Sequence, residues 1–285
     1  MDTNTKIAPF LPLSRVRAQL GESPVWSEVH GAIWWVDISG RALLRTDLNG
    51  ATQKWPTPEI PGFIQCIGTE IFVGMQTGIF KFSPHTATFK RCVELALQNQ
   101  RFNDACTDTQ GRIWAGTMDI GNANDSGVLF LFDPAKNTLT PKLQGFRTIN
   151  GLAWDDTRKR LMFSDSHPSI QTVWTSSLDE NEQLLPRSFF VDFSKLLGRP
   201  DGAALDKNGH YWIAGVGGAL LYQFTTIGKL IAQYQVPVQS PTKPAFIGDA
   251  SGAMVLTSFA DIANGGLLGI WRPPPTAPVQ ESHTQ

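Results

Sequence analysis

The sequence predicts an all-β protein that folds as a six-bladed β-propeller, with four antiparallel strands in each blade around a central channel. Three observations lead to this prediction: similar short segments recur six times, they begin 38 to 51 residues apart, and helical periodicity is rare. Repeats of about 40–50 residues are typical of propeller blades. The six segments begin at Glu22, Gln65, Asn103, Asn150, Asp201 and Ala245.

Each repeat has the same order of parts: a polar residue, a short apolar strand, a turn from Asp to Gly, and a strand with an aromatic residue. Asn103 precedes Trp114 by 11 residues, and Asp201 precedes Trp212 by the same distance. In the turns, Asp accepts bonds from backbone N–H groups and Gly supplies a positive φ. Such turns are expected at 108–111, 206–209 and 249–252.

Short apolar or alternating runs predict the strands of the blades. They lie at 32–37, 70–74, 112–116, 128–133, 160–164, 210–214, 219–224 and 254–258. One short helical turn is expected between Ser188 and Leu197.

A single propeller is predicted over residues 15–272. We expect the ring to close by pairing strands from the two ends of the chain, because unpaired end strands would leave bare sheet edges. Residues 1–14 are then an N-terminal extension. Residues 273–285 are rich in Pro and polar residues, which predicts a mobile tail.

The composition excludes several classes of partner. The 285 residues include 24 basic and 25 acidic ones, for a net charge of −1, so no basic surface is expected to attract nucleic acid or anionic lipid. The N-terminus shows no signal-peptide pattern, and no apolar segment is long enough to cross a membrane. Three cysteines without a C-x-x-C motif argue against a disulfide scaffold. We therefore expect a cytoplasmic protein with reduced thiols.

Glu22, Asn150 and Asp201 are the candidate metal ligands. They stand at matching openings of three repeats, and the first strand of every propeller blade starts at the channel, so they are expected to converge. Three oxygen donors, completed by water, suit a hard divalent cation. The lack of His and Cys argues against a structural zinc site. The alternative for each residue is a turn cap or a satisfied strand end.

Arg101 and Asn103 are the candidate substrate-binding residues. Their spacing of two places both side chains on one face of a strand. Their donors and acceptor suit a polyhydroxylated or carboxylated ligand. The alternative is a surface pair between Arg101 and Asp104. Asp165 is expected either to face the channel or to cap a turn.

Five motifs resemble those of the regucalcin (senescence marker protein)/gluconolactonase/luciferin-regenerating-enzyme family, in family order from about Leu20 to Trp271. They are L-G-E-S-P-V-W, R-F-N-D-A-C-T-D-T-Q-G-R-I-W-A-G-T-M, I-N-G-L-A-W-D-D, F-S-D-S and R-P-D-G-A-A-L-D-K-N-G-H-Y-W-I-A. The resemblance implies a six-bladed propeller with one divalent metal at the channel mouth, and hydrolysis of sugar lactones. It implies metal ligands at Glu22, Asn150 and Asp201, substrate contacts at Arg101 and Asn103, and Asp201 as acid/base.

Two positions depart from the family pattern. Gly121 stands where animal regucalcins have an acidic residue that contacts substrate, and 216–218 replace a Trp-Gly-Gly-like segment with Val-Gly-Gly. The sequence does not specify the role of the 119–125 loop, which sugar lactone is the substrate, or the oligomeric state.

Together, these observations predict a metal-dependent hydrolase that opens sugar lactones, either aldonolactones or aldarolactones. Its cofactor would be one divalent ion: Ca, Zn, Mn or Mg. Two alternatives remain at this point. One is hydrolysis of other esters or phosphotriesters at the same site, and the other is a divalent-cation-binding propeller without enzymatic activity.

Overall fold

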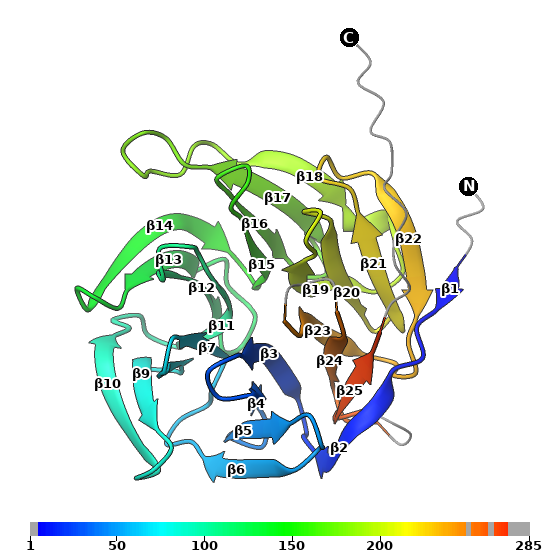
Figure 1. Cartoon of the computed structure of the whole chain (residues 1–285). Helices are drawn as coiled ribbons and strands as arrows, with labels where there is room; N and C mark the ends of the chain where they lie inside the picture. Colours follow the sequence, from blue (N-terminus) through cyan, green and yellow to red (C-terminus); the bar gives the residue numbers. More distant parts are fainter. Residues whose placement is uncertain (1–4, 249–251, 262–264, 273–285) are drawn as a thin grey trace.

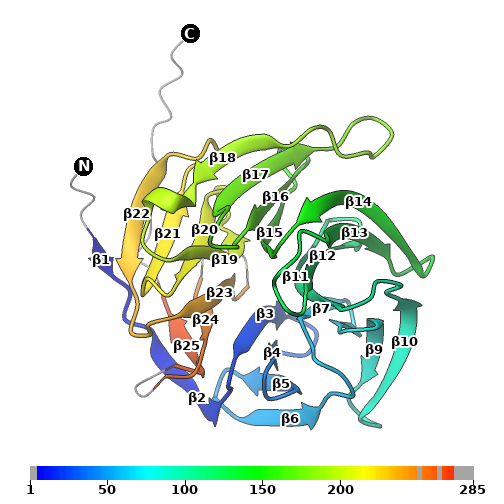
Figure 2. The same ribbon diagram turned by 180° about the vertical axis from the view of Figure 1, so that it is seen from behind.

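The computed structural model describes residues 5–248, 252–261 and 265–272, and it is all-β (Figure 1). Six sheets, each with four antiparallel strands, stand around a channel, which confirms the six-bladed propeller; Figure 2 shows the same ring from behind. The first strands of neighbouring blades contact one another all around the ring, so these strands line the channel.

The blades are numbered 1 to 6 in chain order. Blade 1 holds β3 (Gly21–Ser27), β4 (Ala32–Asp37), β5 (Ala42–Asp47) and β6 (Thr52–Pro56). Blade 2 holds β7 (Phe63–Ile67), β8 (Glu70–Gly74), β9 (Gly78–Ser83) and β10 (Thr88–Glu94). Blade 3 holds β11 (Gln100–Thr107), β12 (Ile113–Asp119), β13 (Gly127–Asp133) and β14 (Thr138–Phe146).

The second half of the ring repeats this arrangement. Blade 4 holds β15 (Ile149–Asp155), β16 (Arg160–Asp165), β17 (Thr172–Ser177) and β18 (Ser188–Asp192). Blade 5 holds β19 (Arg199–Leu205), β20 (Tyr211–Val216), β21 (Leu220–Phe224) and β22 (Leu230–Gln235). Blade 6 holds β23 (Pro241–Phe246), β24 (Met254–Ser258), β25 (Leu267–Trp271) and, from the start of the chain, β2 (Leu11–Arg17).

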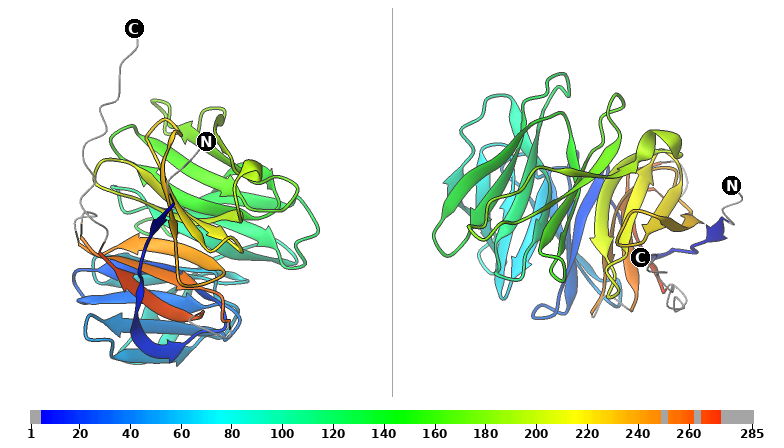
Figure 3. Two further views of the ribbon diagram at one scale, coloured as in Figure 1. Left: turned by 90° about the vertical axis from the view of Figure 1, so that its right-hand side faces the viewer. Right: turned by 90° about the horizontal axis from the view of Figure 1, so that it is seen from above.

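The two ends of the chain close the ring, as predicted. β2 pairs antiparallel with β25 in blade 6, and the left view of Figure 3 shows this pairing from the side. β1 (Lys6–Ile7) pairs parallel with β22 and adds a fifth strand to the outer edge of blade 5. The boundary predicted at residue 15 thus falls inside β2. A closing edge strand is held by backbone pairing, so its side-chain pattern is weak. The predicted tail at 273–285 lies outside the described residues.

The expected helical turn is present as the 3₁₀ turn η1 (Phe193–Lys195). Nowhere in the described residues is there a helix long and apolar enough to span a membrane. The turns at 108–111 and 206–209 form as predicted, with bonds of 3.0 Å from Gly111 N to Asp108 O and 2.9 Å from Gly209 N to Asp206 O. The third predicted turn, 249–252, lies mostly outside the described residues.

The core consists of layers between neighbouring blades. In one layer, Trp114 of blade 3 packs with Phe163 of blade 4, and both are fully buried. The Asp-to-Trp spacing also has a structural reason. The Trp114 indole Nε1 donates to Asp108 Oδ2 at 3.2 Å, and blade 5 repeats this bond between Trp212 and Asp206 at 3.0 Å. Each turn is therefore tied to the strand that follows it.

Five of the six first strands carry a β-bulge, in which two residues face one residue of the next strand. The bulges lie between Glu22 and Val25, Phe102 and Ala105, Asn150 and Ala153, Pro200 and Ala203, and Pro241 and Pro244. A bulge bends its strand and re-aims the neighbouring side chains. This irregularity, repeated in five blades, brings consecutive side chains to the channel.

Candidate metal and lactone site

A cavity of about 170 Å³ opens at the end of the channel where the first strands begin. The residues proposed from the sequence all line it: Glu22, Arg101, Asn103, Asn150 and Asp201. They come from blades 1, 3, 4 and 5, so the fold brings together residues up to 179 positions apart. Drug-sized ligands occupy cavities of about 300–1,000 Å³, so this space suits a smaller ligand such as a single sugar ring.

One detail of the sequence prediction was wrong. Glu22 and Asn150 do occupy the same position, directly before the bulge, but Asp201 lies one residue later, inside the bulge. Its structural equivalent in blade 3 is Asn103. In the sequence, the similar pairs Asn150-Gly151 and Asp201-Gly202 suggest that Asn150 and Asp201 are equivalent. The bulge begins at Gly151 in blade 4 but at Asp201 in blade 5, so the structural alignment differs from the sequence alignment by one residue.

Glu22 and Asp201 form a buried acidic pair. Their exposed fractions are 8% and 7%. Burial, together with the nearby Asp104 carboxylate, raises the pKa of Glu22 to about 8. Burial likewise raises the pKa of Asp201 well above its ordinary value, and the charge of Glu22 adds to this shift. Both carboxylates are costly to ionise in the absence of a cation, because each loses hydration and repels the other.

The unused oxygen atoms at this point fit a hard cation. Within the described residues, the Asp201 carboxylate accepts no hydrogen bond, and Glu22 accepts one, at Oε2 from Ser23 N at 2.6 Å. Asn150 is oriented by two bonds of 2.9 Å: its Nδ2 donates to Ser166 Oγ, and its Oδ1 accepts from Asn103 Nδ2. The donor set is therefore two carboxylates and one amide oxygen, which suits Ca²⁺, Mg²⁺ or Mn²⁺ better than Zn²⁺.

The amide oxygen of Asn150 is essential to this fit. Across 5–248, 252–261 and 265–272, no group of three or more His, Cys, Asp or Glu side chains could hold a metal by itself. A cation here would therefore need Asn150 and water to complete its coordination.

Arg101 and Asn103 lie side by side in the cavity wall. Arg101 Nη1 donates to Asn103 Oδ1 at 2.8 Å and to Phe102 O at 2.9 Å. Burial lowers the pKa of Arg101 to about 10, which leaves the guanidinium charged at neutral pH. Asn103 also donates to Ile149 O at 2.9 Å, so blade 3 is fastened to blade 4 at the mouth of the site. The alternative pairing of Arg101 with Asp104 is not the one observed.

Asp104 instead pairs with Lys243, a residue that the sequence reasoning missed. Asp104 Oδ1 accepts a hydrogen bond from Lys243 Nζ, and the exposed side-chain fractions are 2% and 7%. Asp104 Oδ2 accepts from Leu152 N at 2.8 Å. This buried pair joins blades 3, 4 and 6, and its charges act on Glu22 and Asp201.

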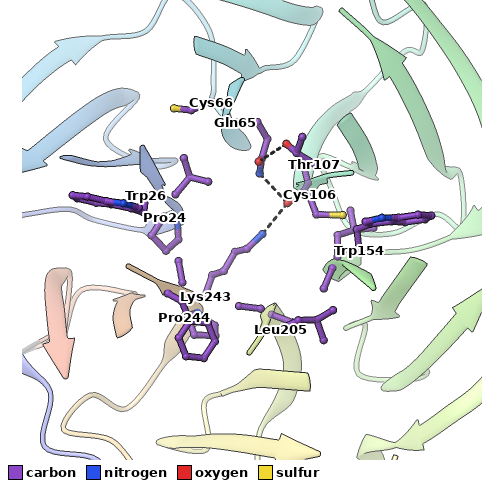
Figure 4. Close-up of a pocket in the computed structure, with 18 of the residues that line it drawn as sticks. Pro24, Trp26, Gln65, Cys66, Cys106, Thr107, Trp154, Leu205, Lys243 and Pro244 are labelled. Atoms are coloured by element: carbon purple, nitrogen blue, oxygen red, sulfur yellow. Dashed lines mark hydrogen bonds between the residues drawn. The ribbon is translucent and has the colours of Figure 1, made fainter. Parts of the chain in front are cut away.

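Lys243 also reaches the opposite end of the channel. A larger cavity of about 390 Å³ lies there, where the first strands end. Figure 4 shows Lys243 pointing into its centre between Trp26 and Trp154, while Gln65 bonds to Thr107. No residue that lines this cavity in the described part of the chain is acidic, so it offers no cation site.

Asp165 caps a turn. It is buried, and its carboxylate accepts from the backbone N atoms of Arg147, Thr148 and His167 at 2.8, 3.1 and 3.0 Å. It therefore holds the loop that carries the cavity residue Thr148, which answers the question left open by the sequence.

The 119–125 loop contributes Asn122 to the cavity, whereas Gly121 is not among the lining residues. Asn122 Oδ1 accepts from Thr148 Oγ1 at 2.6 Å. Val216, from the segment that departs from the family pattern, lines the cavity as well. The three cysteines, Cys66, Cys92 and Cys106, are half-buried and take part in no disulfide.

Arg199 is a further residue that the sequence reasoning missed, and it lines the cavity that holds Glu22 and Asp201. It is half-buried and precedes Asp201 by two positions, as Arg101 precedes Asn103. The motif R-P-D-G repeats the order of R-F-N-D, and this similarity was the available signal.

Comparison with known proteins settles the family. The model of the SMP-30/Gluconolactonase/LRE-like region matches residues 20–260. The chain belongs to this family.

Its relatives include a 6-deoxy-6-sulfogluconolactonase from Pseudomonas putida, 29% identical over 88% of this chain and 87% of that protein. A pentonolactonase from Haloferax volcanii is 27% identical over 87% of this chain and 84% of its own. Among solved structures, a regucalcin from Agrobacterium tumefaciens, described as a calcium-binding protein, superposes with a TM-score of 0.85 at 24% identity, covering 94% of this chain and 95% of that one. At that identity, the superposition supports the fold alone.

Proposed function

We propose that this protein is a divalent-metal-dependent lactonase that hydrolyses sugar lactones. The observation that carries the proposal is the buried Glu22–Asp201 pair beside Asn150, in a cavity sized for one sugar ring. Family members named for the hydrolysis of sulfogluconolactone and pentonolactone support this substrate class. The donor set of two carboxylates and one amide oxygen supports the choice of a hard cation.

Glu22, Asn150 and Asp201 would hold the cation. When bound, a divalent cation supplies a Lewis acid for the lactone carbonyl and neutralises the two carboxylates. The ordered Asn150 amide keeps its oxygen directed into the cavity, because its nitrogen is bonded to Ser166.

Asp201 would act as the general base. Its carboxylate faces the cavity without a protein donor in the described residues, so it can accept a proton from an attacking water. The water oxygen forms a bond to the carbonyl carbon, the bond from that carbon to the ring oxygen breaks, and Asp201 passes the proton to the ring oxygen. Arg101 and Asn103 would orient the sugar hydroxyls. No covalent intermediate with the protein is required.

The proposal is tested with Asp201→Asn, which keeps the shape of the side chain but removes its charge. We expect kcat for lactone hydrolysis to fall by at least ~10²-fold, because a general base contributes about 10²–10⁴-fold. Asp133→Asn, at the far end of β13, is the matched control and should retain activity. Chelation should abolish activity, and Ca²⁺, Mn²⁺ or Mg²⁺ should restore it.

The substrate panel separates the rival functions. It contains aldonolactones, aldarolactones, simple esters and a phosphotriester. Faster turnover of the phosphotriester or the simple esters would replace the proposal with a different hydrolase at the same site. Calorimetric binding of a divalent cation without turnover of any compound would favour a cation-binding propeller without enzymatic activity.

A further inference from the structure

Two arginines occupy equivalent positions in blades 3 and 5. Arg101 lies two residues before the bulged residue Asn103, and Arg199 lies two residues before its equivalent, Asp201. Both arginine side chains line the cavity. Two residues along a strand return a side chain to the same face, so the fold presents a pair of guanidinium groups on either side of blade 4.

The two guanidinium groups differ in their hydrogen bonding. Arg101 donates hydrogen bonds to Asn103 Oδ1 and Phe102 O. Arg199, by contrast, makes no hydrogen bond and no ion pair with any described residue. Its charge is felt by Asp201, where it opposes the rise in pKa that burial causes. A guanidinium carries five N–H donors in a fixed plane and stays charged, so Arg199 offers an unused, bidentate anion site.

The net charge of the cavity with a divalent cation bound also favours an anionic ligand. Glu22 and Asp201 are the acidic residues among the described lining of the cavity. A divalent cation balances these two carboxylates and leaves the charges of both arginines uncompensated. A cavity with excess positive charge favours a substrate that is itself an anion, and it disfavours cationic or strongly apolar ligands.

We propose that Arg199 selects sugar lactones that carry a second, anionic group away from the reacting carbonyl. This inference rests on the proposed lactonase function and deepens it. The anion is a carboxylate, sulfonate or phosphate, since all three present two oxygen atoms to a planar guanidinium. Arg101, held by Asn103 and the backbone, orients hydroxyl groups, and Arg199 binds the anion.

The experiment compares kcat/KM for gluconolactone with that for the same lactone bearing a carboxylate, a sulfonate or a phosphate at carbon 6. Wild-type protein should prefer an anionic lactone. Arg199→Gln should lower kcat/KM for the anionic lactone by about 10–150-fold, the value of a charge-assisted hydrogen bond. The loss on the neutral lactone should be at least ~10-fold smaller. Arg199→Lys should recover part of the preference, because it restores the charge but not the planar donor pair.

Arg41→Gln is the control for net charge. Arg41 is exposed, lies in a turn on the same end of the ring, and donates to Pro58 O outside the cavity. Arg41→Gln should leave the ratio of kcat/KM between the anionic and the neutral lactones unchanged. The three anionic lactones show which anion the site prefers.

Equal losses on neutral and anionic lactones in Arg199→Gln, or a wild-type preference for the neutral lactone, would overturn the inference and leave the lactonase proposal standing. Absence of hydrolysis for every lactone would overturn both.

Discussion

Replacing Lys243 by Met removes the cation that balances Asp104 while keeping most of the buried stem. Burial by itself lowers the pKa of Lys243, but the neighbouring Asp104 carboxylate outweighs burial, and the pKa is raised. The ammonium is therefore charged in the folded protein. The stem also fills space, since a Cβ at Gly202 would lie 2.4 Å from Lys243 Cβ. Met is the substitution that best preserves this packing.

The expected loss of stability in Lys243→Met follows from the burial of both side chains. The Lys243 and Asp104 side chains are 7% and 2% exposed. Removing one partner of a buried ion pair costs about 3–5 kcal/mol, because the remaining charge has lost both its water and its counterion. The two backbone bonds of Asp104, from Ala105 N and Leu152 N, each 2.8 Å, keep its carboxylate in place and prevent it from turning to solvent. At about 2–4 °C per kcal/mol for chains of ~150–250 residues, Tm should fall by about 6–20 °C.

The assay is urea and thermal unfolding of four metal-free proteins: wild type, Lys243→Met, Asp104→Asn and the double variant. Because Asp104→Asn removes the charge that Lys243→Met leaves unpaired, the double variant should be more stable than the sum of the single losses predicts, by at least ~1 kcal/mol. A loss below ~1 kcal/mol in Lys243→Met would refute the reasoning. Strict additivity in the double variant would show that the two groups do not act as a pair.

Two further predictions concern a thiol and a glycine. Burial raises the pKa of Cys66 from 9.0 to about 12, which leaves little reactive thiolate at pH 8. Alkylation of Cys66 at this pH, followed by peptide mass spectrometry, should therefore be about 10³-fold slower than that of an ordinary thiol. A rate within tenfold of free cysteine would contradict this. Gly151→Ala should destabilise the protein by about 2–5 kcal/mol, because φ is +63° and the new Cβ would lie 2.5 Å from Tyr211 Oη. Gly31→Ala, with φ of +55° and nothing within 4 Å, should show only the smaller backbone cost.

The fold could be predicted because a propeller repeats its local signals. The Asp-to-Gly turns, such as 206–209, and the strands that follow them are specified within about a dozen residues. Ring closure followed from the need to pair sheet edges. The start of the ring could not be placed, because β2 contains Pro12 and has an exposed Leu11, so it lacks the alternation of an inner strand. Its position depends on β25, whose paired residues lie 250 to 259 positions away.

The five candidate site residues reach one cavity because each belongs to a first strand. Sequence patterns identify such residues well when polar side chains interrupt apolar strands, as Glu22 and Asn150 do. They do not identify partners that meet across the channel. Lys243 lies in blade 6, two residues before the repeat segment that begins at Ala245, and Asp104 lies in blade 3, so no local signal links the two. Long-range pairing of charges is a property of the closed ring, so it becomes visible only in three dimensions.

The bulge gives the site its internal order. Directly before it stand Glu22 and Asn150, inside it stand Asn103 and Asp201, and the next residue is Asp104 in blade 3 and Lys243 in blade 6. The proposed cation ligands thus occupy the first two of three consecutive positions along the channel, Asn103 shares the second position with Asp201, and the buried ion pair takes the third. The equal spacing of Asn103 to Trp114 and Asp201 to Trp212 already contained this register. Placing Asp201 with Asn103 makes Arg199 the counterpart of Arg101. The same one-residue shift that corrects the predicted register therefore reveals the residue that we propose selects the substrate.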